Sequence, residues 1–148
     1  MQSANVEFVL IGGVAAIIHG STRMTSDLDV AMPFTATNLE RFITTLRPFH
    51  PVHATRPDLS LLDESIERLM SARMLLVETD LGRVDAMPEV VPLGSYAGLE
   101  TVEREIFGEP CRVLAIESLI AVKRHVGRPK DLEVAYELEA VLDRLRAR

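Results

Sequence analysis

Three aspartates are the side chains in this sequence best suited to bind a metal ion: Asp27, Asp29 and Asp85. Asp27 and Asp29 belong to an alternating run, D-L-D-V-A-M, that predicts a β-strand. Residues two apart on a strand leave the same face, with Cα atoms roughly 6 to 7 Å apart. Carboxylates held side by side repel each other unless a counter-ion is present, and Mg²⁺ or Mn²⁺ removes that cost. The pattern therefore indicates a metal site, with a solvated strand face as the alternative.

Asp85 is the candidate third ligand. It lies between apolar residues in R-V-D-A, on the second arm of a predicted hairpin. A third acid on a neighbouring strand would complete a two-metal site, in which two ions clamp the attacking and leaving oxygens of a phosphoryl displacement. We therefore expect all three carboxylates within reach of one cation, and Asp85 on the opposite face of the sheet would remove this mechanism.

Gly12 and Gly13 lie between a predicted strand and a predicted helix. There, backbone N–H groups at a helix N-terminus can receive a phosphate, and a side chain would block its approach. A tight strand-to-helix turn is the alternative interpretation. The loop lacks the Lys-Ser or Lys-Thr of a Walker A motif, and the dinucleotide-binding glycine fingerprint is also absent.

Two residues of the following segment are further candidates for binding a nucleotide. Arg23, four residues before Asp27, can hold a phosphate with its planar fork or form an ion pair that orients Asp27 or Asp29. Thr25 can place its hydroxyl near the metal site or cap a turn.

The two lysines of the chain are Lys123 and Lys130, against 14 arginines. They lie in a dense basic segment between two predicted helices, which also reads as a solvated helix face. Lys123 is a point charge able to reach a triphosphate, and Lys130 either does the same or pairs with Asp131.

Hydrophobic periodicity predicts the elements that must position these residues. Strands are expected over 7–11, 27–32, 74–78, 82–87 and 113–115, and helices over 14–19, 37–46, 117–126 and 129–145. Residues 63–70 give a weaker helical signal, and 49–59 reads as a loop or an edge strand. The mixture lacks strict alternation of strand and helix, so we expect an α/β (α+β) fold with a mixed sheet flanked by helices and a C-terminal helical pair.

Composition limits the classes of protein to consider. The chain has 148 residues, 47 % of them hydrophobic, and a net charge of −6. This predicts one domain over 1–148, with a core over about 5–115 and helices over about 116–146, and excludes a disordered chain. The acidic balance argues against non-specific coating of nucleic acid. A lone cysteine, Cys111, and the lack of a long apolar run favour a cytoplasmic protein without a membrane span.

These motifs together resemble the nucleotidyltransferase superfamily that includes DNA polymerase beta. The resemblance rests on the glycine pair, the acid-apolar-acid triplet and the third acid between apolar residues. The finer pattern resembles the small prokaryotic branch that includes the AbiEii-type toxin nucleotidyltransferases; it spans about residues 8–134 and includes Gly12-Gly13, His19-Gly20, Arg23, Thr25, Asp27-Leu28-Asp29, Ile116 to Ala121, Lys123 and Gly127 to Asp131. Position 13 is Gly where many catalytic members carry Ser.

The resemblance implies Mg²⁺-dependent transfer of a nucleoside monophosphate from an NTP, such as ATP, to an acceptor. The acceptor would be an RNA, including a tRNA end, or a protein side chain, in the manner of a toxin paired with an antitoxin. By family role, Asp27 and Asp29 would bind metal and triphosphate, and Asp85 would bind metal and help activate the attacking hydroxyl. Gly12 and Gly13 would hold triphosphate oxygens.

Two alternatives accompany this interpretation. The first is a catalytically weak nucleotide-binding or assembly module that needs a partner chain. The second is a phosphatase of the haloacid dehalogenase type, which expects Thr or Val two residues after the second aspartate; Ala31 stands there, so we set it aside.

Overall fold

Eight strands form one mixed β-sheet in the computed structural model, which describes residues 5–147. Their order is β4-β3-β5-β6-β2-β1-β10-β9. The bounds are β1 Val9–Ile11, β2 Asp27–Ala31, β3 Val52–His53, β4 Arg56–Ser60, β5 Leu75–Thr79, β6 Gly82–Met87, β9 Thr101–Ile106 and β10 Glu109–Leu114, with β7 Glu89–Val90 and β8 Gly94–Ser95 in a separate ribbon. The ends of the expected 1–148 domain lie outside the described residues.

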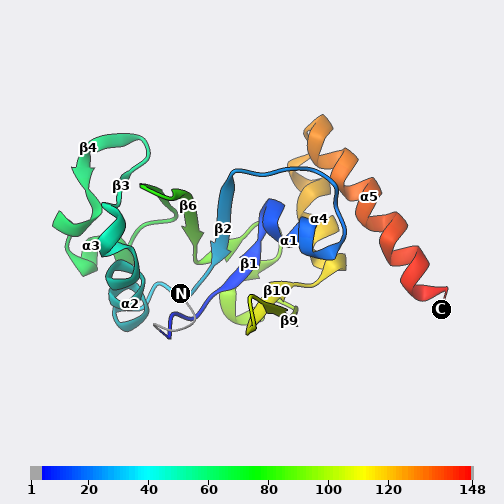
Figure 1. Cartoon of the computed structure of the whole chain (residues 1–148), viewed down its shortest axis with the longest axis horizontal. Coiled ribbons are helices and arrows are strands. Elements are labelled where there is room, and N and C mark those ends of the chain that lie inside the picture. Colours follow the sequence, from blue (N-terminus) through cyan, green and yellow to red (C-terminus); the bar gives the residue numbers. More distant parts are fainter. Residues whose placement is uncertain (1–4, 148) are drawn as a thin grey trace.

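Helices stand at both ends of the sheet (Figure 1). The helices α1, α4 and α5 gather at one end of the molecule, and α2 and α3 at the other. Their bounds are α1 Gly12–His19, α2 Ala36–Leu46, α3 Ile66–Met70, α4 Ile116–Val126 and α5 Pro129–Arg146, with 3₁₀ turns at Arg47–Phe49, Leu61–Asp63 and Tyr96–Gly98. The expected mixed sheet, flanking helices and C-terminal helical pair are confirmed.

The centre of the sheet is mixed and buried. Strand β1 runs parallel to β10 and antiparallel to β2, and β2 runs parallel to β6. Val9 and Val30 are fully buried there, as is Val113. A strand that is buried along its whole length has a continuous apolar run, which explains why residues 7–11 were predicted as a strand.

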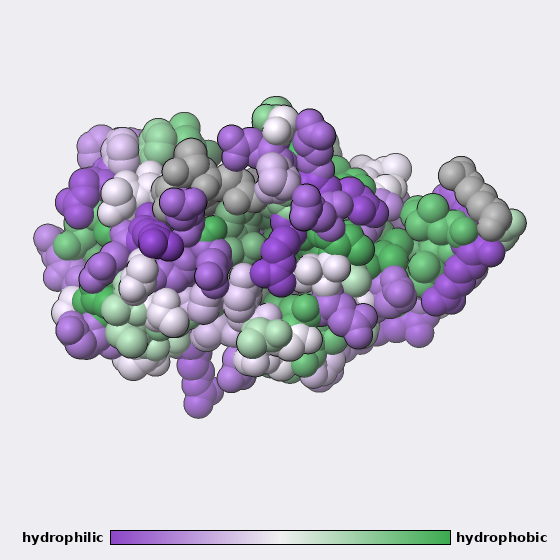
Figure 2. Space-filling model, turned by 90° about the horizontal axis from the view of Figure 1, so that it is seen from below, coloured by the Kyte–Doolittle hydropathy of each residue, from purple (hydrophilic) through white to green (hydrophobic). Residues whose placement is uncertain are grey.

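The C-terminal helical pair is separated by a sharp turn. Helix α4 ends at Gly127, whose φ of 73° suits a glycine, and Pro129 opens α5 at a first-turn position. The apolar face of α5 packs inward through Val134, Ala135 and Leu138. The end of α5 projects from the molecule and shows hydrophobic beside hydrophilic residues (Figures 1 and 2).

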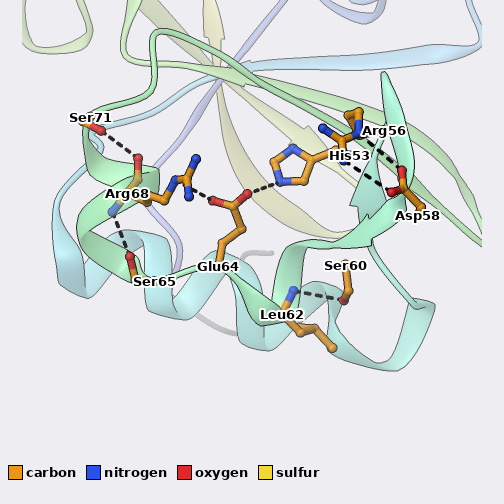
Figure 3. A network of polar contacts seen from close by, with 9 residues as sticks. All are labelled: His53, Arg56, Asp58, Ser60, Leu62, Glu64, Ser65, Arg68 and Ser71. Atoms are coloured by element: carbon orange, nitrogen blue, oxygen red, sulfur yellow. Dashed lines mark hydrogen bonds and ion pairs between the residues drawn. The ribbon is translucent and has the colours of Figure 1, made fainter.

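The segment 49–59, predicted to be a loop or an edge strand, contains β3 and most of β4 at the edge of the sheet. Strand β4 is the edge strand, and Pro57 within it is tolerated because an edge lacks one row of ladder hydrogen bonds. His53 Nε2 lies 2.9 Å from Glu64 Oε1, and Arg68 approaches the other oxygen of that carboxylate (Figure 3). This network joins β3 to the start of α3.

The hairpin of β9 and β10 was not predicted. The apolar pattern predicts a strand over 113–115 alone, whereas the two strands pair from Thr101 opposite Leu114 to Ile106 opposite Glu109. Exposed charged residues form half of β9, so its apolar alternation is weak. Helix α1 also begins two residues earlier than expected. Within residues 5–147, no helix is both long and apolar enough to cross a membrane.

Candidate active site

The register of β2 against β6 brings two of the predicted acids together. Asp29 is the Cα partner of Asp85, and Asp27 is the partner of Arg83. Paired residues on adjacent strands project from the same face, and so do residues two apart on one strand. Asp27, Asp29 and Asp85 therefore occupy one face of the sheet, as the sequence predicted.

Arg83 shares this face and neutralises the third acid. Its Nε donates a hydrogen bond to Asp85 Oδ1 at 2.9 Å, and the Asp85 side chain is 14 % exposed. The hydrogen bond and the charge of Asp85 raise the pKa of Arg83 further. In the structure, the Asp85 carboxylate is thus already paired with the Arg83 guanidinium.

Asp29 lies in the least favourable surroundings of the three. Burial raises the pKa of its carboxyl above the ordinary value of 3.8, and the charges of Asp85 and then Asp27 raise it more. Lys123 and Arg83 act in the opposite direction. The raised pKa of Asp29 is thus the result first of burial and then of the neighbouring carboxylates.

The expected convergence of Asp27, Asp29 and Asp85 on one cation is not present. Among the residues that the structure describes, no group of three or more His, Cys, Asp or Glu side chains is arranged to hold a metal ion. Repulsion between the carboxylates and the Arg83 hydrogen bond explain the separation. The donor set nevertheless fits a hard divalent cation, because oxygens from two adjacent strands share one face and Asp29 lacks a hydrogen-bonded counter-ion among residues 5–147.

The two glycines are required by close approach. Gly12 has a φ of 66°, and a Cβ on it would lie 2.9 Å from both Cβ and Cγ of Asp29. A Cβ on Gly13 would lie 2.8 Å from Cβ of Thr25, so a serine at position 13 would require Thr25 to shift. The N-cap residue of α1 is Ile11, whose apolar side chain accepts no hydrogen bond from the first N–H groups of the helix.

A polar pocket of about 390 Å³ opens where the acids meet the helices. Eight of the predicted site residues line it: Gly13, Arg23, Thr25, Asp27, Asp29, Asp85, Lys123 and Lys130. Gly12 packs against Asp29 behind the pocket wall. Asp27, Asp29 and Asp85 come from the sheet and form an anionic wall. The residues at the junction of α4 and α5 form a cationic wall, which consists of Lys123, Arg128 and Lys130 together with Asp131.

Asp131 holds two basic residues of the cationic wall, but not the predicted one. Its pairing with Lys130 was wrong, because neighbouring residues on a helix point in different directions. Asp131 instead accepts from Arg128 Nε at 2.7 Å and lies 3.5 Å from Lys123 Nζ. Burial raises the pKa of Asp131, but the Arg128 hydrogen bond and the charges of Lys123 and Arg128 outweigh this and hold it below the ordinary value. Lys130 has no ion pair in the described part of the chain.

The segment between α1 and β2 holds the other two candidates. Arg23 forms an ion pair with Glu133 of α5, so the alternative in which it pairs with Asp27 or Asp29 was wrong. The Thr25 hydroxyl lies 3.4 Å from both the N and the O of Asp27, a turn-capping arrangement. His19, by contrast, bonds through Nε2 to the Leu114 carbonyl at 2.8 Å and joins α1 to β10.

Sequence reasoning missed several residues around the pocket. Arg83 could have been found, since the two-residue spacing that puts Asp27 beside Asp29 also puts Arg83 beside Asp85. Asp131 was visible only as a charge next to Lys130. Glu133 and Glu137 gave no signal, because their partners lie more than 100 residues away in the chain.

Comparisons with known proteins identify the fold. No protein-family model matches the chain, and no curated protein matches it. Among solved structures, an antigenic nucleotidyltransferase-like protein from Paracoccidioides brasiliensis aligns with a TM-score of 0.62 and 16 % identity, over 96 % of this chain and 70 % of the other. The solution structure of the antibiotic-resistance factor ANT(2'')-Ia aligns with 0.57 and 16 %, over 99 % and 85 %. A crystal structure of ANT(2'')-Ia with adenylyl-2''-tobramycin aligns with 0.54 and 17 %, over 99 % and 90 %. The chain therefore has a nucleotidyltransferase-like fold.

Proposed function

We propose that this protein is a divalent-metal-dependent nucleotidyltransferase that transfers a nucleoside monophosphate from an NTP to an acceptor hydroxyl. The observation that carries the proposal is the pairing of Asp29 with Asp85 on one sheet face, opposite a wall of cations in the same pocket. Carboxylates on one side and lysines on the other are the two halves needed to hold a metal-bound triphosphate.

The acids supply the metal side of this reaction. Asp27, Asp29 and Asp85 would hold Mg²⁺ or Mn²⁺, which when bound neutralises phosphate charge and polarises the reacting oxygens. Asp85 would also accept the proton of the attacking hydroxyl, once Arg83 no longer occupies its oxygen. The acceptor oxygen forms a bond to the α-phosphorus while the bond from that phosphorus to pyrophosphate breaks.

The remaining residues would hold the triphosphate. Lys123 and Lys130 face the pocket and would balance the charge of the leaving pyrophosphate. Arg23 would exchange Glu133 for a phosphate oxygen. The N–H groups of Gly12 and Gly13 at the start of α1 would donate to phosphate oxygens that no side chain blocks.

The acceptor is the open part of the proposal. The sequence resemblance favours an RNA, including a tRNA end, or a protein side chain, and a toxin role with an antitoxin partner rests on that resemblance alone. The ANT(2'')-Ia complex contains an adenylylated tobramycin, which adds a hydroxylated small molecule as an acceptor class to test.

Label transfer tests the proposal directly. The protein is incubated with Mg²⁺ and each α-labelled NTP, with tRNA, total RNA, protein or an aminoglycoside as acceptor. We expect transfer to one class, and a loss of at least about 100-fold in Asp29→Asn and Asp85→Asn, the scale of removing transition-state charge stabilisation. Asp80→Asn is the matched control, since Asp80 pairs with His50 at the β5–β6 turn. Absence of transfer, with metal and NTP binding unchanged in Asp29→Asn, would refute the proposal.

One observation favours a second candidate, a catalytically weak nucleotide-binding or assembly module. Arg83 holds Asp85, and the three acids do not converge. A module of this kind would bind Mg²⁺ and NTP in the same titration but give no label transfer until a partner chain is added.

A further inference from the structure

The loop between α1 and β2 contributes to the pocket without any regular structure of its own. Residues 20–26 run from the end of α1 back to the start of β2 in the sheet (Figure 1). Arg23, Met24 and Thr25 of this loop line the pocket, and Met24 is 96 % exposed. Gly20 N and Ser21 N donate hydrogen bonds to backbone carbonyls of α1. Beyond them, a segment without a strand or helix ladder depends on side-chain contacts to keep one position.

Glu137 of α5 supplies those contacts. Its carboxylate accepts a hydrogen bond from Thr22 N at 3.0 Å, from Thr22 Oγ1 at 2.8 Å and from Ser21 Oγ at 3.2 Å. Ser21 Oγ in turn accepts from Arg23 N at 3.2 Å. One carboxylate thus fixes the backbone immediately before the pocket residues. The hydrogen bond from the Thr22 backbone N–H, and then the one from the Thr22 hydroxyl, hold the pKa of Glu137 below its ordinary value. The carboxylate is therefore ionised at neutral pH.

Two further residues of α5 meet the same loop on either side of Glu137. Glu133, one turn earlier, pairs with Arg23. Val141, one turn later, comes so close to Gly20 that a Cβ there would lie 3.2 Å from Val141 Cγ2. Positions four apart share one helix face, so the loop is seated along a single stripe of α5.

From these contacts we infer that Glu137 is a positioning residue: it holds the loop of residues 20–26 so that Arg23 and Thr25 face the pocket. The inference about the loop stands on the hydrogen bonds, and its effect on nucleotide binding rests on the proposed function. Helix α5 does not depend on this carboxylate for its own packing, because its buried face is formed by Val134, Ala135 and Leu138.

Trypsin cleavage after Arg23 measures whether Glu137 holds the loop. The fragment that ends at Arg23 is followed by mass spectrometry in the intact chain, in the absence of nucleotide. Glu137→Gln replaces one accepting oxygen by a donor, and we expect cleavage to rise at least about tenfold, the factor that one lost charged hydrogen bond corresponds to. Glu139→Gln is the matched control, because Glu139 lies on the same helix and pairs with Arg124 instead.

Titration with Mg²⁺-ATP and Mg²⁺-GTP then links the loop to the pocket. We expect Glu137→Gln to weaken nucleotide binding several-fold and Glu139→Gln to leave it unchanged. Thr22→Val removes one donor from the loop side without altering α5, and it should shift both measurements in the same direction, by less. If Glu137→Gln fails to fold, Thr22→Val decides whether the hydrogen bonds to Glu137 hold the loop.

The outcomes separate the inference from the proposed function. Cleavage after Arg23 at the wild-type rate in Glu137→Gln would overturn the inference. If cleavage rises in Glu137→Gln but its nucleotide affinity equals that of the wild type, the positioning role is overturned. The position of the loop would then have no effect on nucleotide binding. If the wild-type protein binds no nucleotide, the proposed function fails, and proteolysis still decides whether Glu137 holds the loop.

Discussion

Substitution of Gly12 by alanine tests whether close approach to Asp29 is the reason for a glycine at the start of α1. Two costs are expected. A Cβ at a φ of 66° is strained by about 1–2 kcal/mol. The same Cβ would lie 2.9 Å from Cβ and Cγ of Asp29, on a central strand that cannot easily move, and overpacking of this kind costs about 1–3 kcal/mol.

The sum, about 2–5 kcal/mol, predicts a large loss of stability for Gly12→Ala. At about 2–4 °C per kcal/mol for a chain of this size, Tm should fall by about 4–20 °C. Thermal and urea unfolding followed by circular dichroism measure it. Gly108→Ala is the first control, because Gly108 has a φ of 79° with nothing within 4 Å of its Cβ, and it carries the strain cost alone.

The contact with Asp29 is isolated by difference. Gly98→Ala, at a position with neither strain nor a neighbour, should be nearly neutral. Gly12→Ala should exceed Gly108→Ala by the overpacking cost, and that excess should disappear when Asp29→Gly is added, giving a coupling energy of about 1–3 kcal/mol in the double-mutant cycle. Equal destabilisation of Gly12→Ala and Gly108→Ala would refute the reasoning.

Three further predictions concern the charges around the pocket. Arg83→Gln should raise Mn²⁺ affinity on the order of tenfold, measured by electron paramagnetic resonance of free Mn²⁺, because it removes a cation that competes for Asp85; unchanged affinity would contradict this. Asp131→Asn should cost about 1–3 kcal/mol in urea unfolding, because the Asp131 side chain is 3 % exposed and its cationic partners, Lys123 and Arg128, lose their counter-ion; a loss below about 0.5 kcal/mol would argue that the wall does not depend on it. Because the folded-state pKa of Glu137 lies below its ordinary value of 4.5, its ionised form adds stability that is present above pH 4.5 and lost as the pH falls through the folded value. Stability of Glu137→Gln should therefore fall less steeply than that of the wild type below pH 4.5, and parallel curves would count against the hydrogen bonds to its carboxylate.

The acids of the site were predictable because they depend on local rules. A period of two placed Asp27 and Asp29 on one face before any partner strand was known. The pairing of Asp29 with Asp85 was an expectation about neighbouring strands, and it required β2 and β6 to be adjacent and parallel with a register that the sequence does not encode locally. The glycine pair was found, but its reason, contact with Asp29 and Thr25, appears only in three dimensions.

The cationic wall was harder to predict because its contacts are non-local or compete with one another. Asp131 has four basic residues within eight positions in the chain, and sequence spacing alone favoured the nearest one, Lys130. Helix geometry turns that neighbour away and brings Lys123 across from α4. The loop contacts to Glu133 and Glu137 join segments more than 100 residues apart, for which a single sequence carries no periodic signal.

The charges of the pocket suggest why nucleotide and metal would have to bind together. The lining side chains include four acids and four bases, so their formal charges cancel. Most of the bases are already paired, Lys123 and Arg128 with Asp131 and Arg23 with Glu133. A free triphosphate would therefore exchange one partner for another rather than meet an excess of positive charge, and the desolvated acids of the sheet would repel it. For the proposed function, divalent cations on the acidic wall turn that repulsion into attraction, so affinity for the nucleotide is set by the metal before it is set by the lysines.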